Sequence, residues 1–196
     1  MRCRLSQILV FLIASFLAVS LLSARNLGAA PFLQENRPEN LKALWELILQ
    51  SYYVKNDPKT AVALLRGVVP DQSRIQKALK DGAAPEVAQK IAAKFREFGL
   101  PTEANLAFFL LGGLGSVTVY GATTEELAAY QEGSAAFKHF PRGAQKAAQQ
   151  ILRPGMIFYQ VVVVSSSEQN FHVTYQMLYW DGQQWTMLAK PWEVLH

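Results

Sequence analysis

Three strand-like runs near the C-terminus constrain the fold of this chain more than any other feature. Ile157–Val164 and Phe171–Trp180 are rich in β-branched and aromatic residues, and Gln183–Lys190 continues the pattern after an Asp-Gly turn signal. Runs of this kind, separated by one polar loop and one Asp-Gly pair, are typical of an antiparallel meander. We therefore expect a β meander over residues 156–192.

Residues 37–100 carry apolar side chains at helical spacing. Proline or aspartate stands where each of four successive patterns begins, and glycine or proline stands where most of them end, as expected for helix starts and stops. The four starts fall at Pro38, Pro58, Asp71 and Pro85. This region is therefore expected to be helical, with apolar stripes that cover the sheet.

Residues 101–155 form a mixed segment. Asn105–Leu111 is uniformly apolar and too short for periodicity to assign, so a buried helix and an inner strand both remain open. Ser116–Tyr120 alternates like a strand and is a candidate fourth member of the meander. Thr123, followed three residues later by a glutamate, fits a capping box that begins a further helix.

Together these patterns predict an α+β fold: N-terminal helices packed on a C-terminal antiparallel meander of three to four strands. No repeat, low-complexity tract or long linker divides residues 31–196, which are expected to form a single domain. Only 17% of the residues are charged and 51% are apolar, a composition that favours a globular chain over a disordered one.

Residues 1–30 have the three parts of a secretory signal peptide. Arg2 and Arg4 precede an apolar run over Ile8–Leu22, and small residues follow it. The run is short for a membrane span, which needs roughly twenty apolar residues. We expect a cleaved signal peptide, the alternative being an uncleaved anchor over residues 8–24. Both place the domain outside the cytoplasm, in the periplasm or the extracellular space.

The net charge of +4 comes mostly from this N-terminal segment. Of the 19 basic residues, three precede residue 31, where no acid occurs, so 16 basic residues face 15 acidic ones in the domain. Nucleic-acid binding is therefore not implied. Contact with a membrane is expected only through the N-terminal segment, if that segment is not cleaved.

Cysteine and histidine offer little chemistry. Cys3 precedes the apolar run, so it is not a lipidation site, and cleavage would leave the domain without a thiol or a disulfide. His139, His172 and His196 show no metal-binding spacing, so neither a metal nor another cofactor is expected. His172, at the start of a strand, is the one weak candidate for a general base in a hydrolase or isomerase.

Other polar motifs are better explained by structure. Glu125 and Glu126 suit the first turn of a helix, where the helix dipole favours acids. The glycines of Gly112–Ser116 lack the spacing of a phosphate loop and lead into a strand. Ser165–Ser167 lies in a hairpin loop without the sequence context of a nucleophilic serine.

Aromatic residues gather near one end of the expected sheet. They can form a surface for a ligand or partner, or they can pack in the core, and both possibilities stay open. Basic residues are not interleaved with them, which argues against nucleic acid. The residues concerned are Tyr175, Tyr179, Trp180, Trp185 and Trp192.

The two faces of the middle strand are expected to alternate strictly. A tight turn at Asp181-Gly182 would place the even-numbered residues from His172 to Trp180 on one face and the odd-numbered residues from Phe171 to Tyr179 on the other. Both faces carry large apolar residues. Either helices cover both faces, or the sheet curls around an apolar interior that contains a pocket.

Several stretches resemble a group of exported bacterial proteins to which no activity is assigned. They are Gly121–Tyr130, Phe140–Ala144, Leu152–Val164 and Tyr179–Trp192. The resemblance therefore transfers no functional residue. More weakly, helices followed by a meander are similar to the nuclear-transport-factor-2-like cone fold, in which a curled sheet holds an apolar pocket. Catalytic members place an acid or histidine pair in that pocket, and here only His172 would qualify.

The function expected from these observations is that of an exported, non-enzymatic cell-envelope protein with an interaction or structural role. Its partner would be another envelope protein. The alternative is a small-ligand-binding pocket protein of the cone-fold type, with a small apolar ligand. A hydrolase or isomerase using His172 is the third possibility.

Overall fold

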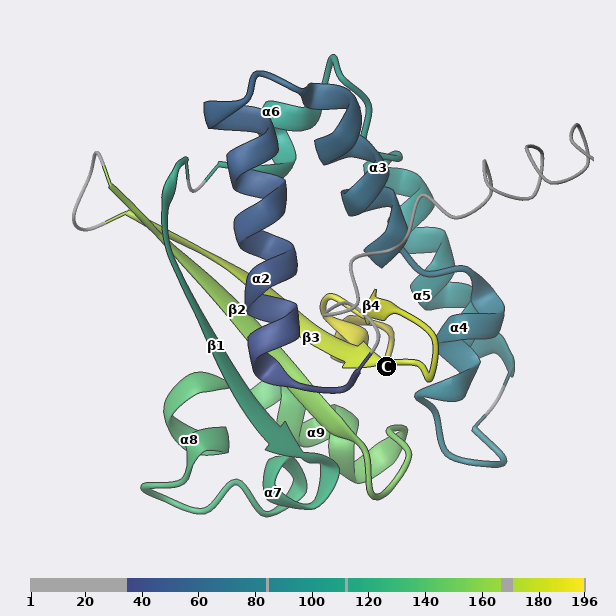
Figure 1. Cartoon of the computed structure of the whole chain (residues 1–196). Helices are drawn as coiled ribbons and strands as arrows, with labels where there is room; N and C mark the ends of the chain where they lie inside the picture. The colour runs from purple at the N-terminus through teal and green to yellow at the C-terminus, as the bar shows by residue number, and fades with distance from the viewer. Residues whose placement is uncertain (1–34, 84, 112, 167–170, 196) are drawn as a thin grey trace, which may run out of the picture. The chain divides into compact units, whose positions relative to one another are not determined.

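A four-stranded antiparallel sheet lies between two groups of helices (Figure 1). The computed structural model describes residues 35–83, 85–111, 113–166 and 171–195. The sheet has the order β1-β2-β3-β4, so each strand pairs with its neighbour in sequence. Its strands are β1 (Gly115–Thr123), β2 (Ile157–Ser165), β3 (His172–Trp180) and β4 (Trp185–Met187).

The helices lie mostly before the sheet in sequence, and three of them connect β1 to β2. This confirms the expected α+β class with an antiparallel meander. The helices are α2 (Pro38–Leu49), the π-helix η2 (Gln50–Val54), α3 (Pro58–Val68), α4 (Gln72–Lys77), α5 (Pro85–Phe98), α6 (Leu106–Phe109), α7 (Thr124–Ala129), α8 (Ala135–His139), α9 (Arg142–Gln150) and the 3-10 helix η3 (Pro191–Val194).

Several helix starts are set by local hydrogen bonds that the sequence indicates. The Asp57 side chain accepts from the Thr60 N–H at 3.1 Å, and the Asp71 side chain accepts from the Arg74 N–H at 2.8 Å. Thr123 forms the expected capping box at the start of α7. Each cap satisfies a backbone donor that the first helical turn leaves without a partner.

The structure decides three predictions that concern the mixed segment and the meander. The apolar stretch Asn105–Leu111 contains the short helix α6 and no strand. Ser116–Tyr120 lies within β1, which pairs with β2 along its whole length and is the fourth strand. The third run of the meander is shorter than expected, because β4 has only three residues.

Strict alternation along β3 is wrong, because the strand contains a β-bulge. Val161 of β2 lies opposite Tyr175, whereas Tyr159 lies opposite Leu178. One residue of β2 therefore faces two residues of β3, the second of which, Met177, has a left-handed backbone with φ 56°. Since a one-residue shift exchanges the faces, Tyr175 and Leu178 lie on the same side of the sheet.

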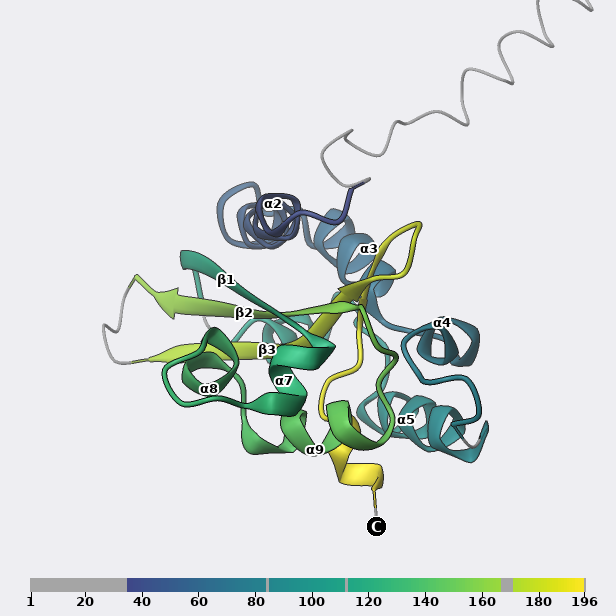
Figure 2. The same ribbon diagram turned by 90° about the horizontal axis from the view of Figure 1, so that it is seen from below.

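Helices cover both faces of the sheet, as Figure 2 shows, with α2 and α3 on one side and α7, α8 and α9 on the other. Each side has its own apolar core. The first core joins α2, α3 and α6 to Tyr159, Val161 and Leu178. The second joins α4, α5 and α7–α9 to Phe158, Met177 and Tyr179. Adjacent residues of one strand thus serve opposite cores, as the pleat requires.

Candidate functional site

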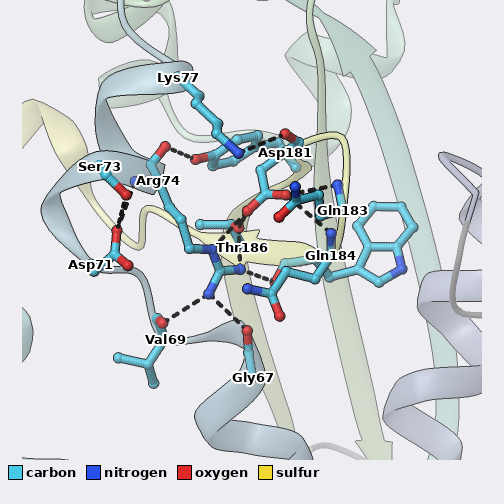
Figure 3. A network of polar contacts seen from close by, with 12 residues as sticks. Gly67, Val69, Asp71, Ser73, Arg74, Lys77, Asp181, Gln183, Gln184 and Thr186 are labelled. Carbon is cyan, nitrogen blue, oxygen red and sulfur yellow. Dashed lines mark hydrogen bonds and ion pairs between the residues drawn. The ribbon is translucent and has the colours of Figure 1, made fainter. Parts of the chain in front are cut away.

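The most highly connected polar group in the described residues is Arg74 of α4 (Figure 3). Its Nε donates to Oδ2 of Asp181 at 2.7 Å, across 107 residues of sequence. Both partners are removed from water, because the Asp181 side chain is only 1% exposed and the Arg74 side chain 10%. Asp181 stands in the loop between β3 and β4, so the pair joins the helical part of the chain to the sheet.

The Arg74 guanidinium uses all of its donors. A guanidinium carries five N–H groups. Nη1 donates to the carbonyls of Gly67 and Val69 at 2.9 and 3.2 Å. Nη2 donates to the carbonyl of Trp185 at 2.6 Å and to Oγ1 of Thr186. With Nε on Asp181, no N–H of this side chain is left for a substrate.

The carboxylate of Asp181 is equally saturated. Oδ1 accepts from the backbone N–H groups of Gln183 and Gln184 at 2.9 and 3.0 Å, and Oδ2 also accepts from the Thr186 hydroxyl at 3.0 Å. Burial would raise the pKa of Asp181, but the hydrogen bonds from Arg74, the two backbone N–H groups and Thr186 outweigh it and lower the pKa. The group is therefore an anion at neutral pH.

Tyr179 of β3 also belongs to this network. Its hydroxyl donates to the backbone carbonyl of Arg74. Burial, and next the nearby charge of Asp181, raise the pKa of Tyr179 well above its ordinary value, so the phenol stays protonated. A network in which every polar group has an internal partner holds elements together. It offers no free group for catalysis or ligand binding.

The five aromatic residues singled out in the sequence do not come together as one surface. Trp185 and Tyr179 are buried, and they belong to opposite cores. Tyr175 stacks on Trp45 with ring centroids 3.9 Å apart, and Trp180 lies edge-on to Trp185 at 5.4 Å.

Trp192, the fifth of these residues, is half-buried against α9. A Cβ atom on Gly143 would overlap its indole ring, so only glycine fits beneath it. The rings thus pack within the structure along several elements. What the sequence could not show is that the β3 bulge separates Tyr175 from Tyr179.

His172 is exposed at the beginning of β3, opposite Val164 of β2. A general base would need to be recessed and within hydrogen-bonding distance of an acid. Among the described residues, no acid makes such a bond to His172. His139 is half-buried and stacks on Tyr120 with ring centroids 3.5 Å apart, while Cys3 and His196 lie outside the described residues.

The part of the chain that the structure describes contains no candidate metal site and no candidate membrane-spanning helix. Within it, no group of three or more His, Cys, Asp or Glu side chains could hold a metal ion. In the same residues, no helix is both long enough and apolar enough to cross a membrane.

Five exposed apolar side chains belong to η2, to α6 and to the residues between α6 and β1. The Tyr53 hydroxyl donates to the Leu110 carbonyl at 2.7 Å and joins η2 to the residues that follow α6. Val54 and Phe108 are 63% and 60% exposed. We name this group of residues the apolar end; its members are Tyr53, Val54, Phe108, Leu111 and Leu114.

Comparison of the chain with protein-family models, with curated proteins and with solved structures finds no match. Function therefore has to be inferred from the geometry of the chain itself. That geometry defines an α+β domain with a saturated internal polar network, an exposed apolar end and, among the described residues, no histidine that pairs with an acid.

Removing the Asp181 carboxylate is expected to destabilise the fold strongly. Asp181→Ala removes the counter-ion of the buried Arg74 charge and the acceptor of two backbone N–H groups, and breaking a buried pair in this way costs about 3–5 kcal/mol. The free energy of unfolding from urea titration measures the loss.

Asp81→Ala is the matched control, since Asp81 also pairs with an arginine, Arg153 at 2.9 Å, but its side chain is 92% exposed. Its effect should stay within about 0.5 kcal/mol, as for ordinary surface positions. Equal effects of the two substitutions would contradict the structural role of Asp181.

The lowered pKa of Asp181 also predicts a pH dependence of stability. Above about pH 5 the carboxylate is almost fully ionised in the folded and unfolded states alike, and its stabilisation is complete. As the pH falls towards the lowered pKa of the folded state, the unfolded chain binds more protons and the stabilisation is lost. Between about pH 5 and about pH 3, the free energy of unfolding should fall more steeply for the native chain than for Asp181→Asn. Parallel curves would refute this assignment.

Proposed function

We propose that this chain is an exported, non-enzymatic protein of the cell envelope that binds another protein. The observation that carries the proposal is the apolar end. Large apolar side chains scattered singly over a surface are ordinary, whereas a group of them marks an interaction site. Aromatic side chains such as those of Tyr53 and Phe108 are enriched in protein interfaces relative to the rest of the surface.

The backbone beneath the apolar end supports the same interpretation. Tyr53 and Val54 belong to η2, a π-helix that continues directly from α2. π-helical turns are rare and often occur at functional sites, because the wider turn changes the direction of the side chains that follow. Here that turn lies where two large apolar side chains are exposed.

The distribution of polar groups favours binding over catalysis. A catalytic site keeps donors, acceptors or a base available to the substrate. In this chain the buried charges of Arg74 and Asp181 are bonded to each other and to the backbone. The exposed position of His172 removes the support for a hydrolase or isomerase that uses it.

A second candidate function is the binding of a small ligand. It is favoured by a cavity of about 150 Å³ between α5 and the segment after β4. The pocket of a cone fold would be formed by the curled strands of the sheet, whereas the lining of this cavity comes from α5 and residues 188–193. The ligand hypothesis therefore stands on this cavity and not on the cone fold.

In-cell photo-crosslinking tests the proposed interface. A benzophenone side chain placed at Phe108 should give one discrete crosslinked product, and adding Leu111→Ser should reduce it about tenfold, because an apolar contact near the centre of an interface is lost.

The matched control is the same probe at Phe137 of α8, an exposed aromatic residue away from the apolar end. It should give no such product. The proposal fails if Phe108 yields no product, if both positions yield the same one, or if Leu111→Ser leaves the product unchanged.

Export is tested by the mass of the protein recovered from its own envelope. Cleavage after Ala24 or near Ala29 should leave a chain that lacks the apolar run, and Leu12→Arg within that run should keep the full-length chain in the cytoplasm. A full-length native chain in the membrane fraction would favour the anchor over residues 8–24. The same chain in the cytoplasm would contradict export.

A further inference from the structure

A cavity of about 150 Å³ separates α5 from the segment that follows β4. Its walls are mainly apolar, formed by Ile91, Phe95, Phe98 and Leu188. Phe98 is 69% exposed, so this aromatic ring is accessible from solvent. An apolar cavity of this size holds one benzene-sized group.

Two lysines and one glutamate also line the cavity. Lys94 Nζ lies 2.8 Å from Oε2 of Glu193, and Lys190 Nζ lies 3.7 Å from Oε1 of the same carboxylate. The hydrogen bond from Lys94 lowers the pKa of Glu193, which therefore stays ionised. Two positive charges thus share one negative charge, and the lysine that is held less closely, Lys190, has a side chain that is 59% exposed.

Residues 188–193, which form the C-terminal wall of the cavity, are held in place by contacts with α9 and β3. The indole of Trp192 packs so closely on Gly143 that a Cβ there would overlap it. Lys146 Nζ donates to the carbonyl of Leu195 at 2.8 Å. At the other end of the segment, the Leu188 N–H donates to the Met177 carbonyl at 2.9 Å. These contacts fix the segment against α9 and β3, and the Lys94–Glu193 ion pair joins it to α5 at the cavity wall.

Ala189, in the same wall, adopts a left-handed backbone with φ 55°. This conformation is strained for an L-residue, and such strain is found preferentially at functional sites and ligand clamps. A preformed apolar cavity with a few charged groups at its wall is the usual form of a small-molecule site.

We infer that this cavity binds a small organic monocarboxylate with a single aromatic ring or a short aliphatic chain. The apolar part fills the space between Phe95 and Leu188, and the carboxylate pairs with Lys190, whose charge Glu193 does not fully neutralise. This site is independent of the apolar end, so it stands whether or not that end binds a protein.

Titration of the isotope-labelled full chain with phenylacetate, followed by NMR amide shifts, tests the inference. Saturable shifts should be confined to α5 and residues 188–193. Lys190→Gln should weaken binding about three- to tenfold, as expected for the loss of a partly exposed ion pair. The neutral analogue phenylacetamide should bind the native chain more weakly by a similar factor.

Lys90→Gln is the matched control, because Lys90 is an exposed lysine one turn from Lys94 that does not line the cavity. It should leave the affinity unchanged. Ala189→Leu, which adds bulk to the wall, should abolish the shifts. If Ala189→Leu does not fold, the comparison of Lys190→Gln with Lys90→Gln still decides the test. The inference is overturned by absence of saturation at about 10 mM phenylacetate, by shifts centred elsewhere, or by equal effects of Lys90→Gln and Lys190→Gln.

Discussion

The buried pair between Arg74 and Asp181 is the interaction on which the arrangement of this domain depends. Hydrogen bonds from the Arg74 guanidinium join α4 to the end of α3, to the β3–β4 loop and to strand β4. Taking both charges out of water is costly and is offset only when every remaining donor and acceptor finds a partner. The network meets that condition, with each oxygen of Asp181 accepting two hydrogen bonds. A strand as short as β4 has little pairing of its own, so these bonds hold it in the sheet.

The position of β4 determines the path of the C-terminal segment. The chain leaves the sheet at Leu188 and is fastened to α9 through Trp192 and Gly143, which leaves a space facing α5. The Arg74–Asp181 network, whose polar groups are all paired, thus positions the C-terminal segment, where Lys190 is exposed beside the cavity. The same contrast appears at the apolar end, where Tyr53 uses its hydroxyl internally and leaves its ring exposed. The groups proposed to bind a partner or a ligand lie at the margins of the domain, and its buried charges serve stability.

Features that depend on nearby residues could be predicted from the sequence. Asp57, Asp71 and Thr123 each accept from an N–H three residues later, so the helix starts they mark can be identified locally. β-branched and aromatic runs likewise indicated the strands and the α+β class. The candidate site could be predicted less well from the sequence. The aromatic residues of β3 and β4 were visible as a group, but nothing in the sequence near Gln176 and Met177 signals the bulge that divides them between two cores.

The sequence by itself determined the class of fold, the strands of the meander and most helix starts, because hydrogen bonds and apolar periodicity within a few residues fix these elements. Only the tertiary structure decided that Arg74 meets Asp181 across 107 residues and that Trp192 rests on Gly143. It also decided that Lys94 and Lys190 share Glu193 beside a cavity. These contacts join segments far apart in the chain, and their geometry depends on how whole elements pack. No pattern of neighbouring residues in the sequence predicts that geometry.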